Sequence, residues 1–228
     1  MARTSRKTGI NHLLASLPPE DSAHLAAISR IEHPPQGRVL TGAAEPTDIW
    51  FPHAGAIALT TTDASGRSVQ TGMVGSEGCV GLEAVFDTAP PLPDATVQIE
   101  GAMTVIPASQ LRTAIEARPP VQAAVSEFLY GLSAQSLQTI ACNRLHSLEA
   151  RCCRWLLTLR NKTRSDDLPV TQECLATLLG SGRPRINALL AVLERDGLLR
   201  RYRGRIHLLA SAGLERRACD CYRELSHE

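Results

Sequence analysis

The spacing of apolar residues between positions 170 and 208 predicts two short helices followed by two short strands. Leucines recur every three or four residues over 171–179, as on the buried face of a helix, and Thr171 stands at the N-cap position. Glycines at 180 and 182 end this helix. A second helix begins at Arg183, and Pro184 suits its first turn because the N–H that proline lacks has no helical partner there. Two helices joined by a glycine-bearing turn are typical of a helix-turn-helix, whose second helix enters the major groove of DNA.

The residues that follow predict a basic β-hairpin. Two apolar-ended segments, 198–202 and 205–208, flank an Arg-Gly turn at 203–204. Residues 183–205 contain seven arginines and no lysine, against two acidic residues. With the two helices, this hairpin completes a winged helix-turn-helix, in which helix and wing both meet DNA. The residues predicted to contact DNA are Thr171, Gln172, Ser181, Arg183, Arg185, Asn187, Arg200, Arg201, Arg203 and Arg205.

The first half of the chain shows a strand pattern instead. Short segments rich in β-branched residues are separated by turn signals, a spacing typical of an antiparallel β-roll or jelly roll. Short helices split by Pro18-Pro19 precede them within 11–32, and Ser109 is expected to cap a short helix that runs to Ile115. The predicted fold class is therefore α+β. The strands are predicted at 49–51, 56–61, 68–74, 95–99 and 103–106.

A long helix is predicted after the prolines at 119–120. Side chains recur there at alternating spacings of four and three, which forms a heptad-like seam over 121–142. A second apolar set, Leu129, Leu137 and Ile140, points elsewhere, so we expect the helix to pack against the β-roll on one side and a second subunit on the other. A core helix that packs only within its own chain is the alternative. The residues predicted for dimerisation are Val125, Phe128, Leu132, Gln135 and Thr139.

Charge divides the chain near residue 143. Residues 1–143 carry 8 Lys and Arg against 13 Asp and Glu, a net charge of −5, whereas residues 144–228 carry 16 against 10, a net charge of +6. A basic half beside an acidic half is expected where one domain meets phosphate. We predict a sensor-type β-roll domain at 1–118, a dimerisation helix at 119–143 and a DNA-binding domain at 144–228, which opens with an amphipathic helix over 145–159.

The sequence indicates neither catalysis nor a membrane segment. It contains no glycine-rich phosphate loop, nucleophile elbow or paired-carboxylate motif, so we do not expect an enzyme. No stretch approaches the roughly 20 apolar residues of a membrane span. The basic segment 1–7 lacks the apolar run of a signal peptide and is expected to be a mobile tail. We therefore expect a cytoplasmic protein.

The seven cysteines do not match a familiar ligand pattern. An odd count in a cytoplasmic chain argues against a disulfide framework. The pairs at 152–153 and 219–221 lack the two-residue gap typical of zinc or iron–sulfur ligands. Cys142 and Cys174 fall on or beside apolar helix faces, where a thiol packs as a small hydrophobe. The seven histidines include no i, i+4 pair. We expect no metal and no cofactor, with a redox or metal sensor as the alternative.

The order of β-roll, long helix and winged helix-turn-helix resembles the Crp/Fnr family of bacterial transcription regulators. The resemblance rests on residues 74–86, which are similar to the glycine-bearing segment of that family's β-roll, and on residues 179–186 and 193–199. It implies a cyclic-nucleotide-binding-like β-roll that senses a signal. It also implies a homodimer, paired through the long helix, that binds a pseudo-palindromic operator on double-stranded DNA and acts with RNA polymerase.

The chain departs from this family where cyclic nucleotides bind. Members that bind them use a Gly-Glu pair for the ribose and an Arg-Ser or Arg-Thr pair for the phosphate. Here Gly81 matches, but Leu82 stands where the Glu would be and Glu83 comes one position late, which in a pleated segment turns it to the other face. The phosphate position is Leu92-Pro93-Asp94-Ala95, and no arginine occurs between positions 67 and 112. We expect neither cyclic AMP nor cyclic GMP to bind.

The recognition helix also departs from the family. Arg183 matches the first base-contacting arginine, but Pro184 stands where many members place a Glu and Ala188 where they place a second Arg. We therefore expect an operator that differs from the best-known one. A ligand-, redox- or metal-responsive regulator is one alternative to a regulator without such a signal. A protein-interaction module whose basic face binds an acidic partner is another.

Overall fold

The computed structural model describes residues 9–41, 47–66, 68–86 and 94–224. The basic segment 1–7, Arg67 and Leu92-Pro93 lie outside the described residues. The chain forms two compact units, one of residues 1–58 and 74–130 and one of residues 59–73 and 131–228. The outer part of one β-hairpin and the second half of the long helix therefore belong to the unit that holds the predicted DNA-binding residues.

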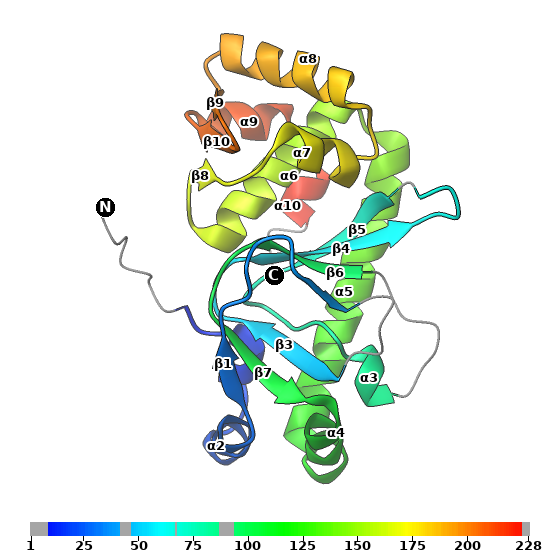
Figure 1. Ribbon diagram of the computed structural model, residues 1–228, viewed down its shortest axis with the longest axis vertical. Coiled ribbons are helices and arrows are strands. Elements are labelled where there is room, and N and C mark those ends of the chain that lie inside the picture. The colour runs from blue at the N-terminus through cyan, green and yellow to red at the C-terminus, as the bar shows by residue number, and fades with distance from the viewer. Residues whose placement is uncertain (1–8, 42–46, 67, 87–93, 225–228) are drawn as a thin grey trace. The chain divides into compact units, whose positions relative to one another are not determined.

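The β-roll consists of two sheets, as the spacing of short strands predicts (Figure 1). The first sheet has the order β1-β7-β3 and is antiparallel, with Trp50 opposite Val105. The second has the order β2-β6-β4-β5. All five predicted strands are confirmed, whereas the three-residue strands β1 and β2 were not predicted. The strands are β1 (Arg30–Glu32), β2 (Val39–Thr41), β3 (Asp48–Pro52), β4 (Ala56–Thr62), β5 (Ser68–Val74), β6 (Asp94–Ile99) and β7 (Met103–Pro107).

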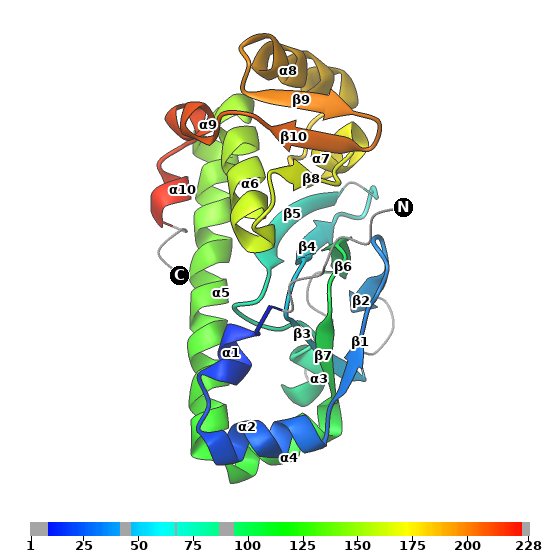
Figure 2. The same ribbon diagram turned by 90° about the vertical axis from the view of Figure 1, so that its left-hand side faces the viewer.

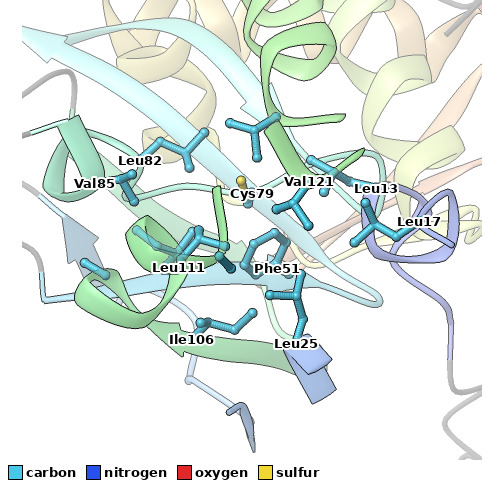
Figure 3. Packing of buried hydrophobic residues seen from close by; sticks show 14 residues of the cluster. Leu13, Leu17, Leu25, Phe51, Cys79, Leu82, Val85, Ile106, Leu111 and Val121 are labelled. Carbon is cyan, nitrogen blue, oxygen red and sulfur yellow. The ribbon is translucent and has the colours of Figure 1, made fainter. Parts of the chain in front are cut away.

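An apolar cluster of buried side chains forms the core of the first unit (Figure 3). Phe51 of β3, Ile106 of β7 and Leu111 of the following helix are fully buried. Burial of one such side chain stabilises a fold by about 1.5–3 kcal/mol. Four short helices supply much of the remaining apolar surface: α1 (His12–Ala15), α2 (Pro19–Ala27), α3 (Glu83–Phe86) and α4 (Ala108–Ala117).

Helix α4 confirms the predicted short helix but not its cap. It begins at Ala108, and the N-cap position belongs to Pro107, which forms no side-chain cap hydrogen bond. Ser109 therefore lies inside the first turn, where its carbonyl accepts a hydrogen bond from Thr113 Oγ1 (3.1 Å). The expectation that Ser109 caps this helix is wrong, because proline at 107 already presets the backbone for helix entry two residues earlier.

Helix α5 (Pro119–Leu145) is the predicted long helix, and its heptad-like seam packs within its own chain. Val125 and Thr139 are only 2% and 6% exposed. Gln135 Oε1 accepts a hydrogen bond from the backbone N–H of Met73 (2.9 Å). The Phe128 ring lies so close to Gly78 that a Cβ there would come within 1.8 Å of it. The seam therefore makes contacts within its own chain, and its role in dimerisation stays a prediction.

The opposite face of α5 carries large apolar side chains that are exposed. Tyr130, Leu137 and Ile140 are 80%, 68% and 62% exposed. Their spacing of seven and three residues places them on one side of the helix, about half a turn away from the seam. Of the predicted second apolar set, Leu137 and Ile140 lie on this exposed face, whereas Leu129 packs against the core of the first unit.

The second unit contains the remaining helices and a three-stranded sheet of order β8-β10-β9 (Figure 2). The β4–β5 hairpin joins this unit through Gln70, whose Oε1 accepts a hydrogen bond from the indole N–H of Trp155. The elements are α6 (Leu148–Thr163), β8 (Asp167–Leu168), α7 (Gln172–Leu178), α8 (Arg183–Arg195), β9 (Leu199–Tyr202), β10 (Arg205–Leu208), α9 (Ser211–Arg217) and α10 (Cys221–Glu224).

Candidate DNA-binding site

The first helix of the helix-turn-helix is fixed at both ends. At its start, Thr171 Oγ1 accepts a hydrogen bond from the backbone N–H of Cys174 (3.1 Å), which confirms the predicted N-cap. At its end, the guanidinium of Arg151 donates to the carbonyl of Leu179 (3.0 Å). Gly180 then adopts a φ of +58°, a conformation that glycine accepts without a steric cost, and turns the chain toward α8.

Helix α8 has the two faces expected of a recognition helix. Ile186, Leu190 and Leu193 are fully buried. The predicted DNA-contacting residues Arg183, Arg185 and Asn187 are exposed, and Pro184 lies in the first turn as predicted. The helix start therefore presents two cationic side chains and an amide to solvent.

The wing is a short antiparallel hairpin backed by a third strand. Arg205 lies opposite Tyr202, and Leu208 lies opposite Leu199. Gly204 has a φ of +75°, which allows the two-residue turn at the tip. On its other edge β10 pairs with β8, where Ile206 lies opposite Leu168. β8 was not predicted, because a two-residue strand carries no periodic signal.

A groove of about 340 Å³ lies between the wing and the starts of α7 and α8. Its lining includes six of the ten predicted DNA-contacting residues, drawn from both helices and both wing strands: Thr171, Gln172, Arg183, Arg201, Arg203 and Arg205. The fold thus gathers residues up to 34 positions apart in the sequence into one concave basic surface.

Ion pairs divide the arginines of this region into two groups. Arg201 donates to Glu194 through its backbone N–H (2.9 Å) and its Nε (2.7 Å), and these bonds hold the pKa of the Glu194 carboxyl below its ordinary value. Arg205 pairs with Asp167 (3.0 Å). The other four predicted arginines are exposed and form no ion pair within the described part of the chain: Arg183, Arg185, Arg200 and Arg203.

Four predicted contact residues do not line the groove. The Ser181 hydroxyl is buried and has no hydrogen-bond partner among the described residues, so it does not face the groove. Arg200 is exposed but does not line the groove. Arg185 and Asn187 are exposed outside the lining.

In the β-roll, the position that resembles the ribose-binding Glu is part of the apolar core. Leu82 is 5% exposed and belongs to the cluster that contains Phe51 and Val85. Glu83 follows as the first residue of α3 and is 9% exposed. Gly81 has a φ of +97°, and a Cβ there would meet the carbonyl oxygen of Asp48 at 2.5 Å. The glycine is thus required for packing with β3.

The cysteines divide into packed thiols and a group that the sequence analysis missed. Burial raises the pKa of the thiols of Cys79 and Cys152, as expected of cysteines that pack as apolar side chains. Cys142, Cys219 and Cys221 instead converge with His146. The i, i+4 spacing of Cys142 and His146 is a helical signal that could have indicated this group.

Comparison with known proteins gives one family model and many similar structures. Residues 150–217 match the Crp-like helix-turn-helix domain. No curated protein sequence matches the chain. Among the described residues, no helix combines the length and the apolar character that crossing a bilayer requires.

Several solved structures share the fold over most of the chain. A transcriptional regulator of the Crp/Fnr family from Eubacterium rectale has a TM-score of 0.70 and 21% identity, and the match covers 90% of this chain and 96% of the other. A CRP-family regulator from Thermus thermophilus also has a TM-score of 0.70 and 21% identity, with 82% and 96% covered. The c-di-GMP-responsive global regulator CLP from Xanthomonas campestris has a TM-score of 0.69 and 17% identity, with 84% and 99% covered. The chain thus has the fold of the Crp/Fnr transcriptional regulators, and its residues 150–217 belong to the Crp-like helix-turn-helix domain family.

Proposed function

We propose that the protein is a homodimeric, sequence-specific DNA-binding transcription regulator of the cytoplasm. The observation that carries this proposal is the basic groove, which brings the N-terminus of α8 and the wing together around Arg183 and Arg203. In a winged helix-turn-helix, the start of the second helix contacts base edges and the wing contacts the backbone. Glu194 and Asp167 form ion pairs with Arg201 and Arg205, which leaves the charges of Arg183 and Arg203 unneutralised.

Dimerisation is proposed to use the exposed face of α5. Tyr130, Leu137 and Ile140 form a row of large apolar side chains along a long helix. A two-fold axis beside this row would bury it against its own copy, as in parallel coiled coils. Such a dimer presents two recognition helices, which favours a pseudo-palindromic operator with half-sites one helical turn apart, about 34–36 Å.

We further propose that DNA binding does not require cyclic AMP or cyclic GMP. Leu82 packs in the core where a ribose-binding Glu would be needed. Asp94 begins β6 at the position where an arginine would neutralise the phosphate, and a carboxylate there repels an anion. The resemblance to transcription regulators also leads us to propose that the protein acts with RNA polymerase.

Two features of DNA binding test the proposed function together. The affinity of the purified chain for genomic DNA fragments should fall steeply with salt, with a slope of about −0.9 per phosphate neutralised. Some fragments should also bind about 10³-fold or more tightly than bulk DNA, a ratio typical of specific regulators. Salt dependence without any sequence preference would instead favour a basic surface for an acidic protein partner.

A regulator that responds to a small molecule, to redox change or to a metal is the second candidate. The Xanthomonas campestris regulator CLP has this fold and is c-di-GMP-responsive, so the fold is compatible with a response to a cyclic dinucleotide in that protein. In this chain the converging cysteines favour a metal or redox signal. Operator affinity that appears only after one of these ligands is added would support this candidate.

A further inference from the structure

Three thiols and one imidazole meet where the long helix ends and the last helix begins. The ligand atoms of Cys142, His146, Cys219 and Cys221 all lie within 4.8 Å of one another. Cys142 Sγ lies 3.5 Å from Cys219 Sγ, and Cys221 Sγ lies 3.5 Å from His146 Nδ1. Figure 2 shows α10, which Cys221 opens, beside α5, on which Cys142 lies. Residues up to 79 positions apart are thus brought into one cluster.

The Cys142–Cys219 and Cys221–His146 distances fit tetrahedral coordination. With Zn–S near 2.3 Å and Zn–N near 2.0–2.1 Å, the edges of a tetrahedral site measure about 3.5–3.8 Å. The two distances above lie at the short end of that range, with no bond between the sulfurs. Three sulfurs and one imidazole nitrogen are a donor set of structural zinc sites, in which all four positions are filled by the protein.

Polar groups beside the cluster can offset negative charge on its sulfurs. Cys142, Cys219 and Cys221 are 0%, 7% and 2% exposed, yet Gln138 Nε2 donates a hydrogen bond to Cys221 Sγ (3.0 Å). Arg154 is 8% exposed, and its Nε has no hydrogen-bond partner among the described residues.

We propose that Cys142, His146, Cys219 and Cys221 bind one zinc ion as a structural site. Three thiolates around Zn²⁺ leave one excess negative charge, which the buried Arg154 offsets. Gln138 orients the Cys221 sulfur from the second coordination shell.

The site would connect the C-terminal segment to the break between α5 and α6. His146 lies in the break between α5 and α6, and Cys219 and Cys221 frame the start of α10. A helix of four residues is not stable without tertiary support. Metal coordination would supply this support, since structural zinc contributes directly to folding free energy.

The direct test measures metal in the full chain and needs no DNA, so its outcome is separate from that of the proposed function. The protein is purified under reducing conditions with zinc supplied, and bound metal is measured by inductively coupled plasma mass spectrometry. We expect about one zinc per chain. We also expect Co²⁺ to give the intense visible bands of tetrahedral coordination. Zinc-free protein that fails to take up either ion, or that holds a Cys142–Cys219 disulfide under these conditions, would overturn the proposal.

Variants assign the ligands. Cys142→Ser, Cys219→Ser and His146→Ala should each lower zinc affinity by about 100-fold or more. Cys174→Ser, which changes a cysteine outside the cluster, should keep about one zinc per chain. His146→Cys should retain the metal and shift the Co²⁺ spectrum toward four sulfur ligands, which a packing role would not produce. Full zinc occupancy in Cys142→Ser and Cys219→Ser, or its loss in Cys174→Ser, would place the metal elsewhere.

Discussion

Arg183 and Arg203 line the same groove, but in the proposed complex they contact different parts of the DNA duplex. Arg183 opens α8, where side chains reach base edges, and Arg203 lies in the turn of the wing, which meets phosphate. Both are exposed. The two substitutions to alanine should therefore have different consequences for DNA recognition.

Arg183→Ala should cost about 1–3 kcal/mol of operator affinity and relax base preference at one position per half-site. The loss follows from the removal of a side chain that donates to a base edge. Titration of operator variants by fluorescence anisotropy measures both effects. Arg195→Ala is the control, because Arg195 is exposed at the other end of the same helix. Equal losses of operator affinity for the two variants would show that α8 does not enter the major groove of DNA by its N-terminus.

Arg203→Ala should weaken binding to operator and bulk DNA by the same factor. It should also reduce the slope of log affinity against log salt by about 0.9, as expected when one phosphate contact is lost. Affinities measured at several salt concentrations test both expectations. A loss confined to the operator would mean that the wing contacts bases instead.

Glu194 should make the stability of the DNA-binding domain depend on pH. Its hydrogen bonds from Arg201 lower its pKa in the folded state, so its contribution is complete above its ordinary pKa of 4.5 and is lost as pH falls through the folded value. Glu194→Gln should therefore lower the free energy of unfolding at pH 7 and reduce the loss between pH 5 and pH 3. Urea unfolding at both ends of this range is the measurement. Glu215→Gln, at an exposed position of α9, should leave the pH profile unchanged.

At the residue scale, sequence reasoning succeeded where the chemistry is local. The Thr171 cap and the position of Pro184 depend on a few neighbouring residues and were predictable. The pairing of Arg201 with Glu194 depends on how the wing folds back on α8, and the burial of the Ser181 hydroxyl depends on packing around the turn. Neither follows from spacing along the chain.

At the element scale, α5 shows the limit of reading a helix by its pattern. A heptad-like seam indicates that one face of a helix is packed. The spacing of its apolar residues is the same whether that face packs within the chain or against a second subunit. Here the β-roll takes the seam, as Phe128 and Val125 show. The row of Tyr130, Leu137 and Ile140 is left for the proposed partner.

The double variant Leu137→Glu/Ile140→Glu should therefore be monomeric and folded. It places charges at two exposed positions of the proposed two-fold interface without touching the seam. Light scattering after size-exclusion chromatography gives the mass, and circular dichroism checks the fold. The matched control is Leu145→Glu, since Leu145 is also exposed but is the last residue of α5, beyond the end of the row. A double variant that remains dimeric would move the interface to another surface.

The elements that escaped prediction are short. β1, β2 and β8 have two or three residues, α3 and α10 have four, and α9 has seven, so none is long enough to show a clear period. The cysteine cluster escaped for a related reason. Cys142 and Cys219 are far apart in the sequence, and only the packing of the C-terminal segment against α5 brings them together.

At the scale of the whole molecule, the proposed function requires a β-roll that binds neither cyclic AMP nor cyclic GMP. Isothermal calorimetry with cyclic AMP and cyclic GMP at millimolar concentration should detect no binding. The melting temperature should stay the same, because a ligand that does not bind the native state cannot stabilise it. Micromolar binding of either nucleotide would contradict the assignment of Leu82 to the core in the functional state.

Selection of DNA from a random library by the full chain and by Arg183→Ala in parallel tests the central claim most directly. The account predicts that the wild-type protein enriches one two-fold-related motif, with half-sites about one helical turn apart. It also predicts that the variant loses preference at one position of each half-site. A wild-type library without an enriched motif, or the same motif from both proteins, would contradict sequence-specific recognition through the start of α8.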